Sequence, residues 1–244
     1  MIEHSDGHPS SSAESTALQS PSDHDLRVAC YCEENAWRVA YRHLHTTKNS
    51  DNRDWDYHVV FISNNHKACP MFRQRAIPRD DPTEYVCWDY HVIVMRSSTV
   101  QTNNKDESIM SEILDIDTWI TPYPTPLVQY LNESFPHAAD SNFNTQYLPL
   151  FHVVRAEDFI RDFYCDRMHM YKNGKWSSPP PEYPAIMNGL KRDDYDGTDK
   201  KELSGSNLDD YISMSGEGKC VFTLAEMYER CIDSNKKEWT EVSK

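Results

Sequence analysis

An amphipathic helix followed by a series of strand-like segments is the feature that most limits the folds open to this chain. Apolar residues recur at i, i+3, i+4 and i+7 from Trp37 to Leu44, which predicts a helix over residues 32–44. Runs of β-branched and aromatic residues predict strands at residues 57–62, 88–95, 113–120 and 151–155. A helix followed by consecutive, mostly antiparallel strands indicates an α+β fold rather than a doubly wound parallel sheet.

The 244-residue chain divides by composition into one domain and two polar ends. A stretch rich in Ser, Asp, His and Pro, without apolar periodicity, predicts a disordered tail over residues 1–27. Residues 28–235 are expected to form a single domain, and residues 236–244 are expected to be a frayed terminus.

The second half of the domain contains two predicted helices separated by a long loop. A helix is predicted near residues 159–168, and a Pro-, Gly- and Asp-rich loop without helix or strand is predicted over residues 172–206. The last helix, over residues 223–231, opens with Thr223 and Glu226 in the spacing of a capping box.

The charge balance limits the partners of this chain. It has 25 Lys and Arg residues against 39 Asp and Glu residues, a formal net charge of −14. A nucleic-acid binder needs a basic stripe to follow the phosphates, so we expect no nucleic-acid partner. The negative charge also disfavours binding to an anionic membrane surface. The sequence has no run of about 18 apolar residues, so a membrane-spanning helix is not expected.

Cysteine usage indicates the compartment. The chain has seven cysteines, an odd number, and its first 25 residues lack the apolar stretch of a secretory signal. Free thiols in a reducing compartment are therefore expected rather than a disulfide framework, which favours a cytoplasmic location and leaves the nucleus open.

Cys32 is the first candidate for chemistry because it stands at the predicted start of the helix over residues 32–44. The partial positive charge at a helix N-terminus favours the thiolate, which is the nucleophilic form of cysteine. The free N–H groups there can also hold a developing oxyanion. A lone cysteine at this position is more often a small buried apolar residue, so a nucleophile needs partner groups.

A histidine and two aspartates in the predicted strands could be those partners. His91 lies among aromatic and β-branched neighbours, where it is either a hydrogen-bonded core residue or a general base. Asp115 and Asp117 are two residues apart in a predicted strand, so both are expected on one face. A buried carboxylate needs a partner, and a histidine on a neighbouring strand would supply it. Cys, His and Asp in this order are typical of papain-like and transglutaminase-like thiol enzymes, with either aspartate as the orienting acid.

Metal and nucleotide sites are weaker interpretations of the same sequence. Cys30 and Cys32, or His43 and His45, suggest ligand pairs, but no second cysteine pair has the spacing of a zinc site. The two histidines fall near the helix end and are expected at the surface. With seven glycines and no GxGxxG or Walker pattern, the chain also lacks a phosphate-binding loop.

Several motifs, taken in order, closely resemble those of the protein N-terminal glutamine amidohydrolase family, which has been named after its WDYHV motif. Together they extend from about Cys30 to Cys231. Several motifs that occur in the family's order identify the family far more specifically than any single motif does. The motifs are Cys30-Tyr-Cys-Glu-Glu-Asn35, Val60-Phe-Ile-Ser-Asn64, Trp88-Asp-Tyr-His-Val92, Asp115-Ile-Asp117, Phe151-His-Val-Val-Arg-Ala156, Asp166-Arg-Met-His-Met170, Pro179-Pro-Pro-Glu-Tyr-Pro184 and Asn207-Leu-Asp-Asp-Tyr-Ile-Ser-Met214.

This resemblance implies a papain/transglutaminase-like core, in which an N-terminal helix bearing the cysteine packs on an antiparallel sheet bearing histidine and aspartate. Matched by motif, Cys32 is the nucleophile, His91 the base and Asp115 the orienting acid of a single catalytic domain. The choice of Asp115 over Asp117 rests on the resemblance. The long polar tail and the expanded loops after Met95 and near residues 190–206 depart from the family pattern without removing a triad member.

The resemblance also implies the reaction: hydrolytic deamidation of an N-terminal Gln side chain to Glu, with release of ammonia through a thioester and without a cofactor. The product would enter an N-degron pathway, so the expected partners of a monomeric enzyme are proteins with N-terminal Gln and other N-degron enzymes. The alternatives are a cysteine protease or transglutaminase-like acyl transferase on the same fold, or a non-catalytic N-degron-binding module.

Selection of an N-terminal glutamine requires a group that binds the free α-amino group. Glu33, Glu34 and Asp89 are candidates because they adjoin the triad motifs and are acidic. For Glu33 and Glu34, a favourable interaction with the helix dipole explains the charge equally well. Trp88 and Tyr90 are expected either to form the pocket wall or to pack within the strand.

Overall fold

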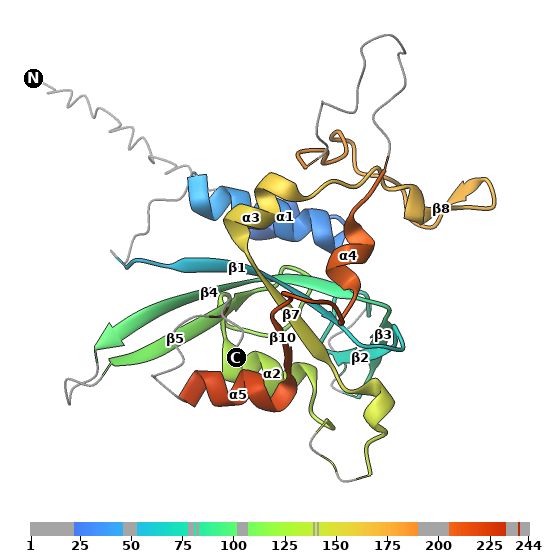
Figure 1. The fold of residues 1–244 in the computed structure, drawn as a ribbon. Coiled ribbons are helices and arrows are strands. Elements are labelled where there is room, and N and C mark those ends of the chain that lie inside the picture. The colour runs from blue at the N-terminus through green and yellow to red at the C-terminus, as the bar shows by residue number, and fades with distance from the viewer. Residues whose placement is uncertain are drawn as a thin grey trace, which may run out of the picture.

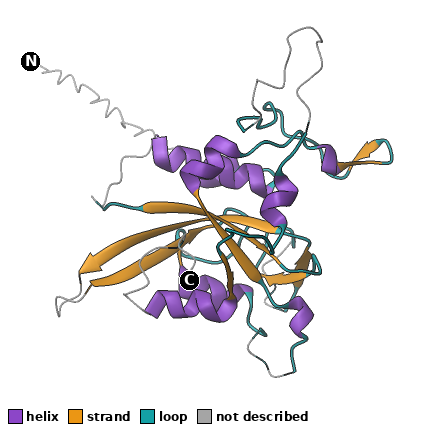
Figure 2. Cartoon of the chain, viewed as in Figure 1, coloured by secondary structure: helices purple, strands orange, loops and turns teal. Residues whose placement is uncertain are grey.

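A computed structural model of the chain describes residues 22–45, 53–77, 81, 83–101, 107–138, 140, 142–189, 205–232 and 239. A six-stranded antiparallel sheet runs through the centre, with helices on both of its faces (Figures 1 and 2). The predicted α+β class is therefore confirmed, with the N-terminal helix packed on the sheet. Within the described ranges, every helix is too short or too polar to cross a membrane.

The central sheet has a non-sequential strand order. From one edge to the other it consists of β10 (Val221–Thr223), β7 (Leu150–Arg155), β1 (Asp56–Ser63), β4 (His91–Gln101), β5 (Glu107–Leu114) and β6 (Thr125–Pro126). Strands β1 and β7 confirm the predictions for residues 57–62 and 151–155. All neighbouring pairs are antiparallel.

Both faces of the sheet are buried, which explains the nearly continuous apolar sequence of β1. Val59 and Phe61 pack into one apolar cluster, whereas Val60 and Ile62 pack into a second cluster on the opposite face. Alternate side chains of a strand point to opposite faces, so one strand supplies both cores. This arrangement holds the residues at the strand ends in fixed positions.

Helices cover the two faces unequally. On one side lie α1 (Cys32–His45), α3 (Ala156–Asp162) and α4 (Leu208–Ile212), and on the other lie α2 (Leu127–Ser134) and α5 (Leu224–Ile232) (Figure 1). Helix α1 confirms the predicted helix. The predicted capping box before α5 is also present, since Glu226 accepts hydrogen bonds from the Thr223 backbone and side chain, and the Glu226 N–H donates to Thr223.

Shorter elements surround this core. They are the 3-10 helices η1 (Asp23–Leu26), η2 (Thr145–Tyr147) and η3 (Met168–Met170), the hairpin of β2 (Cys69–Phe72) and β3 (Tyr85–Trp88), and the hairpin of β8 (Tyr171–Lys172) and β9 (Lys175–Trp176). The second hairpin corrects the prediction that residues 172–206 contain no strand. Residues 190–204 of that predicted loop lie outside the described residues.

Two of the predicted strands are wrong in their limits. The predicted strand 88–95 is two strands, because the chain turns at Asp89, whose carbonyl accepts a hydrogen bond from Ser63 Oγ. The predicted strand 113–120 ends at Leu114, because the Asp115 carboxylate accepts the Asp117 N–H at 2.8 Å and turns the chain. The helix expected at residues 159–168 is α3, which begins and ends earlier.

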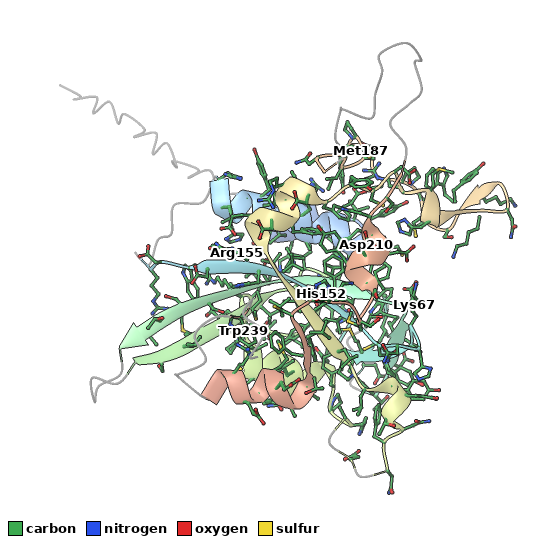
Figure 3. The ribbon with its side chains drawn as sticks, in the orientation of Figure 1. Lys67, His152, Arg155, Met187, Asp210 and Trp239 are labelled. Carbon is green, nitrogen blue, oxygen red and sulfur yellow. The ribbon has the colours of Figure 1, made fainter. Side chains whose placement is uncertain are left out.

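Both predicted polar ends contain described residues that are folded against the domain. The tail does not extend to residue 27, because η1 is helical and Asp23 is buried against His43 and Tyr123. At the other end, Trp239 is buried against Phe222, with ring centroids 6.1 Å apart, rather than frayed (Figure 3). Residues 1–21 and the rest of the predicted frayed terminus, residues 236–238 and 240–244, lie outside the described residues.

Candidate active site

The start of helix α1 is fixed by a side chain three residues beyond Cys32. The Asn35 amide accepts a hydrogen bond from the Val28 N–H at 2.9 Å and donates one to the Val28 carbonyl at 2.8 Å. The Asn35 backbone N–H also donates to the Tyr31 carbonyl. These bonds hold the preceding chain against the helix and place Cys32 in its first turn, as the sequence predicts.

Cys32 opens onto a cavity of about 530 Å³ between the start of α1 and the β3–β4 turn. The cavity brings together residues that are far apart in the sequence, and its wall includes Cys32, Trp88, Asp89, Tyr90, His91 and Asp117. Trp88, Asp89 and Tyr90, the predicted substrate-binding residues of the WDYHV motif, thus lie on one cavity wall with Cys32. His91 is the first residue of β4, so its imidazole lies at the end of the sheet, where it lines the cavity.

A buried hydrogen bond joins the predicted base to the predicted acid. His91 Nε2 lies 3.1 Å from Asp115 Oδ2, and both side chains are about 2% exposed. Tyr130 Oη donates a further hydrogen bond to Asp115 at 2.8 Å. The Trp88 indole stacks on the imidazole with ring centroids 5.9 Å apart. With Nε2 engaged by Asp115, Nδ1 is the ring nitrogen left for proton exchange elsewhere.

The surroundings of this pair keep Asp115 ionised and make His91 more basic. Burial alone would raise the pKa of Asp115, but His91, the Asp117 N–H and Tyr130 lower it below its ordinary value. Burial alone would lower the pKa of His91, but the charge and hydrogen bond of Asp115 raise it. The imidazole is therefore a stronger base than an isolated histidine at the same depth.

The second aspartate has a different environment, which corrects the prediction that both lie on one strand face. Asp117 follows the turn and faces the cavity, where it accepts hydrogen bonds from Arg27 Nε at 2.6 Å and Asn35 Nδ2 at 3.2 Å. Burial and the neighbouring Asp115 raise its pKa. Asp117 therefore links the turn after β5 to Arg27 of the η1 end and to Asn35 of α1. It is Asp115, and not Asp117, that forms the hydrogen bond with His91.

The thiol of Cys32 is not the ready thiolate that a helix start predicts. Burial is the largest influence and raises its pKa well above the ordinary value, and the neighbouring Glu33 and Asp117 raise it further. A hydrogen bond from the Val92 backbone acts in the opposite direction. The thiol is therefore protonated at rest, and a base must remove its proton before it can attack.

The two glutamates after Cys32 differ in their surroundings. Glu34 is fully buried and forms a bidentate ion pair with Arg167, at 2.6 and 2.8 Å, which occupies its carboxylate away from the cavity. Glu33 is also fully buried, and its Oε2 accepts a hydrogen bond from Tyr90 Oη at 3.1 Å and lies 3.7 Å from Cys32 Sγ. Burial raises the pKa of Glu33 to about 7.

The family described as N-terminal glutamine amidase matches residues 27–231. The chain belongs to this family. It is 34% identical over 219 residues to the protein N-terminal glutamine amidohydrolase of Bos taurus, covering 88% of this chain and 91% of the relative. The proteins of the same name from Homo sapiens and Danio rerio are 35% and 30% identical, covering 86% and 89% of this chain and 89% and 94% of the relatives. The resemblance inferred from the motifs is confirmed.

Three residues that contact the predicted site residues were not predicted from the sequence. Tyr130 comes from α2, where nothing in the local pattern distinguishes it from a core aromatic residue. Arg167 and His169 belong to the Asp166–Met170 motif, whose match to the family could have marked them. His169 Nε2 lies 3.4 Å from Tyr90 Oη and 3.9 Å from Glu33 Oε1, and its ring lines the cavity.

The described residues contain no group of three or more His, Cys, Asp or Glu side chains that could hold a metal ion. Of the suggested pairs, His43 lies 2.7 Å from Asp23 and is only 11% exposed, so it is not the surface residue that its place near the helix end predicts. His45 is exposed, as expected.

Proposed function

We propose that this protein hydrolyses the side-chain amide of an N-terminal glutamine to glutamate and ammonia, with Cys32 as the nucleophile, His91 as the base and Asp115 as the orienting acid. Membership of the N-terminal glutamine amidase family supports the reaction. The observation that carries the residue roles is that Cys32 and His91 line one cavity while Asp115 holds His91 from behind. These features also favour a papain/transglutaminase-like core.

The first half of the reaction forms a thioester. His91 Nδ1 takes the Cys32 proton, and the thiolate attacks the carboxamide carbon of the substrate. The first-turn N–H groups of α1, including that of Cys32, stabilise the tetrahedral oxyanion. The imidazolium then returns its proton to the leaving nitrogen, the C–N bond breaks, and ammonia departs.

The second half restores the enzyme. His91 accepts a proton from a water molecule, which attacks the thioester carbonyl, and the C–S bond breaks. The carboxylic acid product leaves, and Cys32 regains its proton. Because burial and Glu33 favour the neutral thiol, the sulfur is a good leaving group only while His91 supplies that proton.

Asp89 is the group that we propose to bind the substrate's α-ammonium. It lies on the cavity wall and is exposed, and one of its carboxylate oxygens accepts the Tyr90 N–H. The other two candidates are less suitable, since Glu34 is engaged by Arg167 and Glu33 is buried beside Tyr90. Trp88 and Tyr90 would then form the wall against which the glutamine side chain packs.

The biological setting is also a proposal. N-terminal glutamate is the product, so the enzyme would feed an N-degron pathway as a monomer in the cytoplasm or nucleus, next to the other enzymes of that route. Proteins that begin with glutamine are the substrates expected from the family.

A peptide assay separates deamidation from the alternatives. The purified protein is given peptides that begin with Gln, Asn or acetyl-Gln, and ammonia and peptide mass are measured. Deamidation predicts ammonia and a gain of about one dalton, the difference between NH₂ and OH, for the Gln peptide alone. A shortened peptide would indicate a protease, an amine-linked product would indicate an acyl transferase, and binding without turnover would indicate an N-degron-binding module.

A further inference from the structure

The hairpin of β8 and β9 projects from the body of the protein (Figure 1). Its two strands are joined by Asn173 and Gly174, which have φ values of 52° and 78°. Positive φ at both central residues is the requirement of a tight two-residue hairpin turn, and Asn-Gly satisfies it at little cost. The tight turn of this hairpin is therefore encoded locally.

The two faces of this hairpin differ in character. Tyr171 and Trp176 are directly opposite each other, with ring centroids 5.1 Å apart, and this aromatic pair stabilises the hairpin. Lys172 and Lys175 are the next opposed pair and share the other face. Like charges directly opposite each other are unfavourable. In the described part of the chain, neither lysine takes part in an ion pair, so nothing there offsets this repulsion.

The face with the two lysines, hereafter the lysine face, continues the wall of the active-site cavity. Lys172 lines the cavity together with His169 and Met170, which precede it in the chain. The base of the hairpin is held by a hydrogen bond from the Ser177 N–H to the Met170 carbonyl at 2.8 Å. Lys175 lies opposite Lys172 on the neighbouring strand, so it is the next cation beyond this wall.

The cations of the cavity wall are not equally engaged. Arg27 is paired with Asp117, and Arg75 donates to the Thr118 carbonyl and stacks on Trp119 at 4.3 Å. Lys172 is exposed and lacks such a pairing among the described residues. The chain as a whole has a net charge of −14, so an exposed cationic face beside this cavity is a local exception. Such a face favours the binding of an anionic group.

We propose that the lysine face receives the polypeptide that follows the substrate's N-terminal glutamine and favours acidic side chains there. The inference rests on the proposed function, because a glutamine bound at Cys32 obliges the rest of the substrate to leave through the mouth of the cavity. An extended chain advances about 3.3 Å per residue, so the residues shortly after glutamine pass the hairpin. Exposed ion pairs of this kind change kcat/KM about two- to fivefold each.

The test compares two peptides that begin Gln-Gly and then carry three glutamates or three lysines, and are otherwise identical. Ammonia release gives kcat/KM for each, and their ratio is the readout. The wild-type protein should favour the acidic peptide about two- to tenfold at low salt, and high salt should reduce the ratio. Lys175→Glu should bring the ratio to one or below, and Lys175→Gln should give an intermediate value.

Arg155→Glu is the matched control, because it makes the same change in net charge. Arg155 is exposed and lies opposite His58 in the register of β7 and β1. His58 is near one end of β1, whereas Ile62, which lies opposite His91, is near the other end. Arg155 and the hairpin are on opposite sides of the view (Figures 1 and 3). The ratio for Arg155→Glu should equal that of the wild type. Equal turnover of the two peptides, or the same ratio for Lys175→Glu and Arg155→Glu, would overturn this inference and leave deamidation intact. Wild-type protein that deamidates neither peptide would overturn the proposed function itself.

Discussion

Two carboxyl groups near the cavity, Asp115 on the sheet side after strand β5 and Glu33 on the helix side in α1, are both buried and have different partners. On the sheet side, Asp115 accepts hydrogen bonds from His91, Tyr130 and a backbone N–H. On the helix side, Glu33 Oε1 has no hydrogen-bond partner in the described residues and lies 3.9 Å from His169. The pKa of Asp115 falls despite its burial, whereas burial raises the pKa of Glu33 to about 7.

This difference shows that the kind of partner, rather than depth, decides the charge of a buried carboxyl group, since the charge of His91 is the largest influence that lowers the pKa of Asp115. The sheet side holds a carboxylate–imidazole pair, Asp115 and His91. The helix side has a carboxyl group beside Cys32 whose pKa is about 7. We therefore expect substitutions on the sheet side to affect turnover most, and those on the helix side to affect stability and its pH dependence.

The largest effect is expected for Asp115→Asn. An amide at this position offers His91 no negative charge and permits the wrong tautomer, and the equivalent change in a serine-protease triad lowers kcat about 10⁴-fold. Ammonia release from a Gln peptide measures it. Asp209→Asn is the control, because that carboxylate is 90% exposed and should leave turnover unchanged. A loss below about tenfold for Asp115→Asn would mean that Asp115 is not the orienting acid.

The next largest effect is expected for Arg167→Met on the helix side. The substitution leaves the fully buried Glu34 without its bidentate partner, which costs about 3–5 kcal/mol in the free energy of unfolding. Urea unfolding measures this loss, and the double variant Glu34→Gln/Arg167→Met should recover part of it. If the single variant is as stable as the wild type, the ion pair is not formed in solution.

Glu33→Gln should change how stability depends on pH. The pKa of Glu33 is about 7 in the folded protein against an ordinary value of 4.5, so between these pH values the folded state retains a proton that the unfolded state releases. Stability therefore falls as pH rises through this range, by roughly 3 kcal/mol at most, and Glu33→Gln removes that fall. Urea unfolding of both proteins at pH 5 and pH 8 measures it. Parallel changes in the two proteins would contradict the raised pKa.

The smallest effects come from removing one hydroxyl on each side. Tyr130→Phe deletes a hydrogen bond to the charged Asp115 and should cost about 2 kcal/mol in stability at pH 7. Tyr90→Phe makes the same chemical change next to Glu33 and should cost less, because that carboxyl group is partly protonated there. Thermal or urea unfolding decides the order. The reverse order would remove the contrast between the two sides.

The elements that position the site were mostly predictable from local pattern. The spacing of apolar residues in α1, the β-branched run of β1 and the capping box before α5 each depend on neighbours in the sequence. The ends of the strands were not predictable in this way. At Asp89 the backbone carbonyl accepts a hydrogen bond from Ser63 Oγ, and at Asp115 the carboxylate accepts one from the Asp117 N–H. The apolar pattern of the sequence continues through both turns and does not reveal them.

The candidate site was only partly predictable for the same reason. The motif resemblance chose Asp115, and the structure gives this choice a physical basis in the contact with His91, but the role remains a prediction. Tyr130, Arg167 and His169 reach the site through tertiary contacts that no sequence period records. The hairpin of β8 and β9 did have a local signal, Asn173-Gly174, between short strands that fell within an apparently loop-like stretch.

Alkylation of the native protein tests the role of Cys32 most directly. The protein is treated with iodoacetamide for increasing times, the modified cysteines are located by peptide mapping, and ammonia release from a Gln peptide is measured for each sample. We expect activity to equal the fraction of unmodified Cys32, and the Gln peptide to slow modification of this thiol. Undiminished turnover in protein whose Cys32 is fully alkylated would contradict this expectation.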